Sequence, residues 1–296
     1  MITCAKVILW LLVVVILTVL GRVVYEVKKF KVTSYRYRDQ RIKKPYRVAV
    51  LADLHDASYG PDNARLLAAI KEAKVRAIWI AGDLITAKDG QVKCQNAKNL
   101  LKRLCVDYPV FYEYGNHERR ARENQELYNQ EYFDFLKELR RKKVKGKGLV
   151  LMNNRMISFY KIGISLSGLD LPMTYYYRSF KGQPDLLKVK ERIGEPEEGL
   201  LPVLLAHHPR FFSVYEKAGA KLVISGHHHG GIVRLPGIGG LISTQGKLFE
   251  KYDRGIFQEG DATMILSAGL GSHTVNVRFL NQPELLVLDL LPENDN

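Results

Sequence analysis

Residues 47–55 read Arg-Val-Ala-Val-Leu-Ala-Asp-Leu-His, a short apolar run that ends on a carboxylate and an imidazole. Such a run is typical of a strand that other layers cover on both faces. Asp53 and His55 then follow the strand directly, where the functional groups of open α/β sheets gather. They are two residues apart, so we expect an extended backbone to point both side chains to the same side.

Four further motifs place similar side chains at strand ends or glycine turns. They are Gly82-Asp83, Gly115-Asn116-His117-Glu118, His207-His208-Pro209 and Gly226-His227-His228-His229-Gly230. Of the 8 histidines in the chain, only His273 lies outside these motifs. Together the motifs supply enough nitrogen and oxygen ligands for two divalent cations. This clustering predicts a catalytic metal site rather than scattered core histidines.

Apolar runs alternate with amphipathic stretches along most of the chain, which predicts a sheet covered by helices. We expect one α/β domain over residues 45–292. Strands are expected at residues 47–52, 77–81, 110–114, 203–206, 222–225, 263–267, 274–279 and 285–291, with a hairpin at 155–168. Helices are expected at 63–74, 94–108, 125–143 and 211–218, and residues 171–199 show no clear period.

The N-terminal segment, residues 2–20, is almost entirely apolar. About 20 such residues cross the hydrocarbon core of a bilayer as a helix, so we expect a transmembrane anchor over residues 1–24. A cleaved signal peptide is the alternative, although no small-x-small cleavage site follows the apolar run. The basic residues 25–44 are expected to form a juxtamembrane linker or an edge strand that contacts anionic headgroups.

The chain carries 45 Lys+Arg against 31 Asp+Glu, a formal charge of +14. This excess favours anionic partners, namely phosphorylated small molecules or acidic lipids. Nucleic acid is disfavoured because the basic run offers only Tyr35, Tyr37 and Tyr46 for stacking on bases. The cationic residues that follow the apolar segment favour a cytoplasmic domain by the positive-inside rule.

In this order, the five motifs resemble those of the calcineurin-like metallophosphoesterase superfamily over about residues 45–290. More narrowly, several features resemble the membrane-associated YaeI-like or YkuE-like branch. They are the N-terminal segment, the Asp-Leu-His start, the Gly-His-x-His-Gly-Gly ending with the Arg234-Leu235-Pro236 that follows it, and the closing Arg278 and Pro283-Glu284. The resemblance implies a four-layer α/β/β/α sandwich with an N-terminal transmembrane helix. It also implies a single-pass cell-membrane protein with an extracytoplasmic domain, in conflict with the flanking charges.

By position, the resemblance implies a role for each motif residue. One metal ion is held by Asp53, His55 and His229, Asp83 bridges both ions, and the second ion is held by Asn116, His207 and His227. The donor set suits manganese, with iron, zinc or cobalt as alternatives. His117 is implied to be the catalytic general acid, outside the metal ligands. We expect His228, the middle residue of its turn, to be exposed; a group that supports the metal ligands without binding the metal is the alternative.

The resulting functional prediction is a dinuclear phosphoesterase that cleaves phosphodiester or phosphomonoester bonds at or near the membrane. Attack by a hydroxide that bridges the two ions is the implied reaction. One alternative is a lipid-linked nucleotide-sugar pyrophosphatase of the UDP-diacylglucosamine hydrolase type, and another is a non-catalytic membrane scaffold. Thr86 stands where purple acid phosphatases carry a tyrosine ligand, and residues 85–87 lack the acidic-arginine pair of Ser/Thr protein phosphatases, which disfavours both subclasses.

Overall fold

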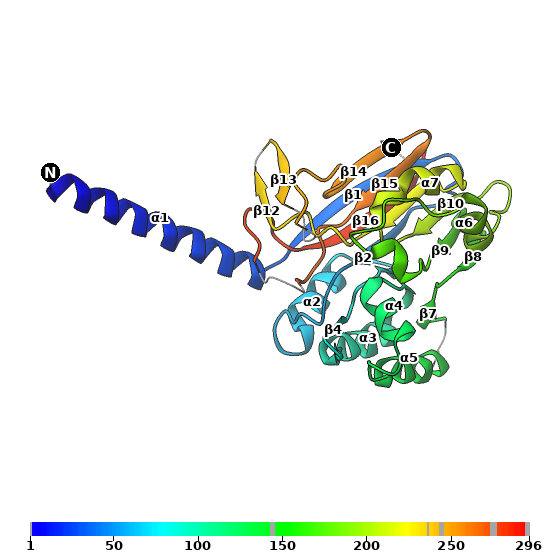
Figure 1. Ribbon diagram of the computed structural model, residues 1–296. Helices are drawn as coiled ribbons and strands as arrows, with labels where there is room; N and C mark the ends of the chain where they lie inside the picture. Colours follow the sequence, from blue (N-terminus) through cyan, green and yellow to red (C-terminus); the bar gives the residue numbers. More distant parts are fainter. Residues whose placement is uncertain (1, 143–145, 236, 243–245, 273–276, 294–296) are drawn as a thin grey trace.

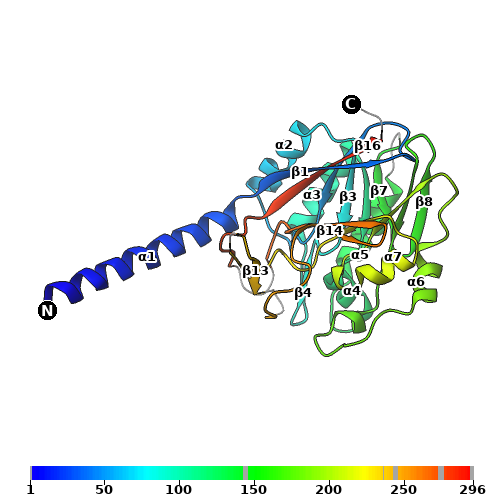
Figure 2. The same ribbon diagram turned by 90° about the horizontal axis from the view of Figure 1, so that it is seen from above.

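The computed structural model describes residues 2–142, 146–235, 237–242, 246–272 and 277–293. Two six-stranded sheets pack face to face, and helices cover the outer faces (Figure 1). Helix α1 (Ile2–Lys28) projects from one end of the domain, as a second view also shows (Figure 2). The predicted four-layer sandwich with an N-terminal apolar helix is therefore confirmed.

The first sheet consists of β1 Lys31–Asp39, β2 Tyr46–Leu51, β3 Ala77–Ala81, β6 Pro109–Glu113, β7 Gly148–Leu151 and β16 Glu284–Pro292. Its strand order is β1-β16-β2-β3-β6-β7. Strands β2, β3, β6 and β7 are parallel, and β16 is antiparallel to β2. The carboxyl ends of β2, β3 and β6 consequently lie at one edge of the sheet.

The second sheet consists of β8 Arg155–Phe159, β9 Ile164–Gly168, β10 Leu201–Leu205, β11 Leu222–Ser225, β14 Gly255–Glu259 and β15 Ala262–Leu266. Its order is β14-β15-β11-β10-β9-β8, and its four central strands are parallel. Two small antiparallel pairs are β4 Thr86–Lys88 with β5 Gln91–Lys93, and β12 Val233–Leu235 with β13 Gly239–Ile242.

The remaining helices are short. They are η1 Pro61–Asn63, α2 Ala64–Glu72, α3 Gln95–Asp107, α4 Asn116–Glu123, α5 Glu131–Arg141, η2 Met173–Tyr176, α6 Leu186–Ile193, η3 Pro209–Phe211 and α7 Phe212–Lys217. Side chains of α2, α3 and α5 pack on the first sheet, and those of α6 and α7 pack on the second.

Successive side chains of the buried strands enter different cores. In β2, Ala49 and Leu51 pack against the helices, whereas Val48 and Val50 pack between the two sheets. In β10, Leu204 instead contributes to the core under α6 and α7. Because side chains alternate across a strand and both faces are covered, these strands are continuously apolar in sequence.

Several predicted elements differ from the structure. The helix expected at 125–143 begins only at Glu131, because residues 124–128 form turns closed by hydrogen bonds to Asn124. The expectation of no periodic structure in 171–199 is wrong for α6, a short helix capped by the Asp185 side chain and burying only Val189 and Ile193. Half of the strand expected at 274–279, residues 274–276, lies outside the described residues, and Phe279 forms an isolated bridge with Val233.

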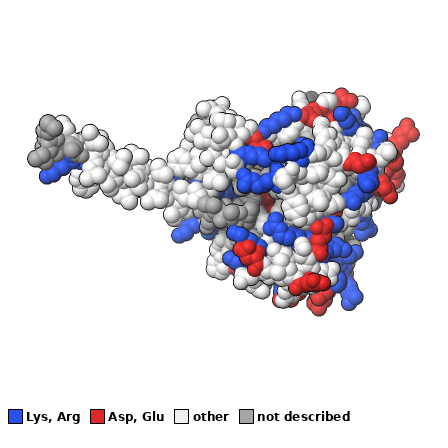
Figure 3. Space-filling model, in the orientation of Figure 1, with Lys and Arg blue, Asp and Glu red and all other residues white. Residues whose placement is uncertain are grey.

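Helix α1 is long and apolar enough to cross a membrane, with a mean hydropathy of 2.8 over an 18-residue stretch within Lys6–Lys28. The part of α1 that projects from the domain carries few charged side chains, whereas Lys and Arg are spread over the domain (Figure 3). Beyond it, β1 pairs with β16 along its whole length, so the basic segment forms an edge strand of the first sheet. Glu26 in the last turns of α1 is fully buried and accepts a hydrogen bond of 2.9 Å from the Asn281 backbone.

The buried carboxylate of Glu118 joins the loops that follow β3 and β6. It accepts hydrogen bonds from the backbone nitrogens of Asp83 (2.9 Å), Ile85 (3.2 Å) and Gly115 (2.9 Å). The Tyr112 hydroxyl donates a fourth, at 2.6 Å. One side chain thus satisfies three buried backbone donors and fixes the position of two loops.

We expect Glu118→Ala to lower the free energy of unfolding by about 3 kcal/mol or more, because each buried donor without an acceptor costs about 1–3 kcal/mol. Urea unfolding in detergent micelles measures this change. Glu123→Ala, on the outer side of the same helix, is the control and should stay within about 0.5 kcal/mol of the wild type. A similar small loss for both variants would contradict the bridging role of Glu118.

Candidate metal centre

Five strand ends from both sheets meet at one place. The segments after β2 and β3 are joined by hydrogen bonds of 3.0 Å from the Asp53 nitrogen to Gly82 and from the His55 nitrogen to Asp83. The segments after β10 and β11 are joined from the Gly226 nitrogen to the His207 carbonyl, at 3.1 Å. This backbone network brings the five sequence motifs together, as their order on the strands predicts.

The backbone turns sharply at the predicted ligands. Asp53 (φ 50°) and His55 (φ 49°) both adopt left-handed conformations, so the expectation of an extended backbone between them is wrong. Their side chains nevertheless converge, because the turn is tied to the loop after β3. Glycine is required nearby: a Cβ on Gly82 would lie 2.5 Å from His207 Nδ1, and one on Gly226 would lie 2.6 Å from Asp53 Oδ2.

Asp53, His55 and His229 form the first cluster of potential ligands. Their candidate ligand atoms lie within 4.8 Å of one another, and all three residues are buried. His55 Nε2 is 3.2 Å from His229 Nε2, which in turn is 3.6 Å from Asp53 Oδ1. These are the three residues that the sequence assigned to one metal ion.

Asp83, His207 and His227 form the second cluster. Asp83 Oδ2 lies 3.2 Å from His207 Nε2 and 3.8 Å from His55 Nε2, so it stands between the two clusters. Asn116 is 6% exposed, and its Oδ1 has no hydrogen-bond donor among the described residues. A buried carboxamide oxygen of this kind fits a metal ligand, because burial without a partner is costly.

Two of the histidines are oriented by backbone carbonyls. His207 Nδ1 lies 2.6 Å from the Ala81 oxygen, and His229 Nδ1 lies 3.0 Å from the Gly271 oxygen. If each Nδ1 carries the proton, Nε2 is left as the lone-pair nitrogen that faces the carboxylates. Histidine ligands of metals are commonly fixed in this way.

The electrostatics of the buried carboxylates differ. Burial raises the pKa of Asp53 to about 7, against the opposing effect of His207. Burial also opposes ionisation of Asp83, but the neighbouring imidazoles of His207, His117 and His55 hold the pKa of Asp83 well below its ordinary value. Burial among other histidines lowers the pKa of His227, which favours the neutral form that a metal requires.

His117 lies beside both clusters. It is 2% exposed and groups with His55 and Asp83, and its ring meets the His55 ring edge to face at 4.8 Å. Its Nδ1 lies 3.0 Å from both the nitrogen and the oxygen of Ala87, so Nε2 points away from that backbone. The ring therefore borders the place where the two clusters meet.

The two motif histidines to which the sequence assigned neither a metal nor a catalytic role, His208 and His228, are both buried. The expectation that His228 is exposed is wrong: it is 3% exposed, and its Nδ1 lies 2.6 Å from the Tyr252 oxygen. The segment before β14 covers this turn, a long-range contact that local turn geometry does not reveal. His208 stacks on Tyr176, at 5.2 Å between ring centres, and groups with His227 and His228.

Sequence reasoning assigned no role to Glu118, Arg278 or Asn281, all of which support the site. The buried Arg278 side chain donates to the Gly271 oxygen (2.7 Å), and the Asn281 side chain donates to the His229 oxygen (2.7 Å). Glu118 stands inside a recognised motif and could have been singled out there. Arg278 and Asn281 lie about fifty residues beyond the last motif, so only the fold brings them to it.

The comparisons with known proteins agree with this geometry. The Calcineurin-like phosphoesterase family matches residues 46–231, a range that contains every predicted metal ligand. The chain is 27% identical over 252 residues to the uncharacterized metallophosphoesterase YkuE of Bacillus subtilis, covering 84% of this chain and 80% of that protein. It is 23% identical over 246 residues to the metallophosphoesterase YkoQ of the same organism, covering 82% and 83%.

A metallophosphoesterase of Helicobacter pylori is 26% identical over 260 residues, covering 86% of this chain but only 62% of its own length. Family, fold and the clustered His and Asp residues point in one direction. They support binding of divalent metal and hydrolysis of phosphoric esters. The chain therefore belongs to the calcineurin-like phosphoesterase family, in its YkuE-like branch, and is a metal-dependent phosphoric ester hydrolase.

Proposed function

We propose that the protein is a dinuclear phosphoesterase that acts on phosphodiesters or phosphomonoesters at a membrane surface. Asp53, His55 and His229 would hold one divalent cation, with manganese the first choice. The second would be held by Asn116, His207 and His227. The observation that carries the proposal is the position of Asp83 Oδ2, 3.2 Å from His207 Nε2 and 3.8 Å from His55 Nε2. A carboxylate between two ligand sets is the expected bridge.

When bound, a pair of cations supplies an acidified water and neutralises phosphoryl oxygens. The side chains and backbone of the protein would position the bridging carboxylate and supply the proton. Glu118 and the His117 backbone, whose nitrogen donates to Asp83 Oδ1 at 2.8 Å, hold the bridging carboxylate and its loop in place. His117 lies next to both clusters and would donate a proton to the departing oxygen.

Helix α1 supports a location at the membrane. We infer that it is an uncleaved single-pass anchor, because its apolar stretch is long enough to cross a bilayer and Glu26 near its end is buried in the domain. A tethered enzyme meets lipid-borne esters at high effective concentration. The location at the membrane makes a lipid-linked pyrophosphate the second candidate substrate. A non-catalytic scaffold ranks below both enzymatic functions, because a scaffold would not require a complete ligand set.

Asp83→Ala should abolish turnover and lower metal content more than any other single ligand change, because both ions would lose a ligand. Plasma mass spectrometry of the purified protein and hydrolysis of a nitrophenyl phosphodiester measure the two effects. Asp107→Ala, at the exposed end of α3, is the matched control and should change neither. Near wild-type turnover of Asp83→Ala with manganese present would refute the two-metal assignment.

His117→Ala should slow hydrolysis of an alkyl phosphate ester by about 100-fold or more, the usual range for loss of a general acid. A nitrophenyl ester should be affected far less, because nitrophenolate leaves without a proton. Comparing kcat on the two substrates isolates this role. Equal losses on both would mean that His117 stabilises phosphoryl charge or packs the site instead.

The full-length protein should sediment with membranes and resist extraction by high salt, which removes only electrostatic binding. A chain that begins at Arg22 lacks the apolar part of α1, so it should be soluble. It retains the Glu26 contact with Asn281 and should still cleave a nitrophenyl ester. Fractionation followed by assay tests both points. Persistent membrane binding of the shortened chain would show that α1 is not the anchor.

A further inference from the structure

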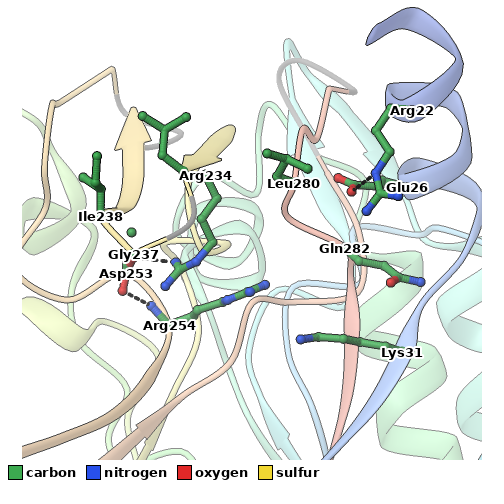
Figure 4. Close-up of a pocket in the computed structure, with 12 residues that line it drawn as sticks. Arg22, Glu26, Lys31, Arg234, Gly237, Ile238, Asp253, Arg254, Leu280 and Gln282 are labelled. Carbon is green, nitrogen blue, oxygen red and sulfur yellow. Dashed lines mark hydrogen bonds and ion pairs between the residues drawn. The ribbon is translucent and has the colours of Figure 1, made fainter. Parts of the chain in front are cut away.

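A cavity of about 630 Å³ lies where α1 meets the domain (Figure 4). Arg22 and Glu26 of α1 and Lys31 of β1 line one side. Arg234 of β12 and Arg254, in the segment before β14, reach in from the other side (Figure 4). This cavity is separate from the metal clusters, and the proposed phosphoesterase reaction does not use it.

Positive charge exceeds negative charge in this cavity. Arg22 pairs with Glu26 at 2.7 Å, and Arg234 pairs with Asp253. Among the described residues, the side chains of Lys31 and Arg254 form no ion pair; Arg254 donates to the Asn281 carboxamide oxygen at 3.1 Å. Two cations of the lining thus face the cavity without a carboxylate in direct contact among the described residues; Glu284 acts on both, and Asp253 on Arg254, from a greater distance.

Neighbouring cations of the lining disfavour the charged forms of both side chains. Burial and the nearby Arg254 lower the pKa of Lys31. Burial and the nearby Arg234 lower the pKa of Arg254. An anion in the cavity would relieve this repulsion, and guanidinium with ammonium is a donor set that suits phosphate oxygens.

The position of the cavity along α1 matches the headgroup layer of a bilayer. At 1.5 Å per residue, the hydrocarbon core of about 30 Å takes up about 20 residues of helix. After Lys6, the first charged residues along α1 are Arg22 and Glu26, so the longest uncharged stretch of the helix ends at Gly21. Arg22 and Glu26, which line the cavity, then lie just outside the hydrocarbon, at the level of lipid phosphates.

Apolar side chains on the same part of the domain are exposed. Ile238, which lines the cavity, is 65% exposed. Leu248 and Phe249, in the segment bridged to β13, are 63% and 60% exposed. Figure 1 shows β12 and β13 on the side of the domain from which α1 projects. Apolar side chains at this level can enter the bilayer interface.

We propose that this cavity binds the phosphate of an anionic phospholipid headgroup, with Lys31 and Arg254 as its ligands. The proposal rests on the inferred membrane anchor and not on the metal centre. A zwitterionic headgroup is a poorer occupant, because its own cation would meet the positive lining. Free phosphate offers the same oxygens but none of the acyl chains that the apolar rim would contact.

A bound headgroup would also lie close to the catalytic side of the domain. Arg254 contacts the Asn281 side chain, whose nitrogen donates to the His229 oxygen at 2.7 Å. The backbone nitrogen of Asn281 donates to Glu26 of α1. Asn281 therefore connects the anchor, the cavity and a predicted metal ligand through direct contacts.

Native mass spectrometry of the full-length protein in detergent micelles, titrated with dioleoyl phosphatidylglycerol, tests the proposal. We expect one lipid per chain, bound at least about tenfold more tightly than dioleoyl phosphatidylcholine. Lys31→Met, which removes no hydrogen bond of the described structure, and Lys31→Met combined with Arg254→Met should each weaken binding. The double variant should lose about tenfold or more, because charge-assisted hydrogen bonds to phosphate are lost.

Lys188→Met is the matched control, since it removes an exposed lysine on α6, at the end of the domain away from α1 (Figures 1 and 2). Its lipid binding should equal that of the wild type. If Lys188→Met and Lys31→Met weakened lipid binding equally, the net charge of the protein would explain the effect, and the proposal would be overturned. Inorganic phosphate that binds as tightly as phosphatidylglycerol would overturn the lipid assignment. Metal content and ester hydrolysis, measured on the same samples, report separately on the proposed phosphoesterase.

Discussion

The structure depends on placing two aspartates and several imidazoles out of water at a junction of strand ends. Asp53 and Asp83 are almost completely buried, and each would cost several kcal/mol as an isolated ion. The chain offsets this cost with backbone donors, such as the His227 nitrogen at 2.9 Å from Asp53 Oδ1 and the His117 nitrogen at 2.8 Å from Asp83 Oδ1. Divalent cations among these ligands would complete the neutralisation, so folding and metal binding are expected to be coupled.

Most of the fold could be predicted from short-range patterns. The strands β2, β3, β6, β10 and β11 are continuous apolar runs, and a ligand motif follows each of them directly. The same patterns failed where burial depends on distant segments: His228 is covered by the segment around Tyr252. The eight-residue helix α6 buries two side chains, too few to give a visible period.

The proposed ligand set could be drawn from the sequence because each motif joins a candidate ligand to its own strand end, and the structure brings these candidates into clusters. The supporting residues could not, because Arg278 and Asn281 reach His229 only through the loop before β16. The turned backbone at Asp53 and His55 was missed for a related reason. Its left-handed conformations are imposed by hydrogen bonds to the loop after β3, and sequence spacing alone favours extended backbone.

The central claim is that Asp83 bridges two divalent cations. Crystals of the full-length or shortened protein grown with manganese, with data collected at the manganese absorption edge, test it most directly. The account predicts two anomalous peaks per chain, one on either side of the Asp83 carboxylate. Asn116 should bind one of the two ions, whereas His117 should bind neither. A single peak, or two peaks of which only one contacts Asp83, in a protein that still hydrolyses esters would contradict the account.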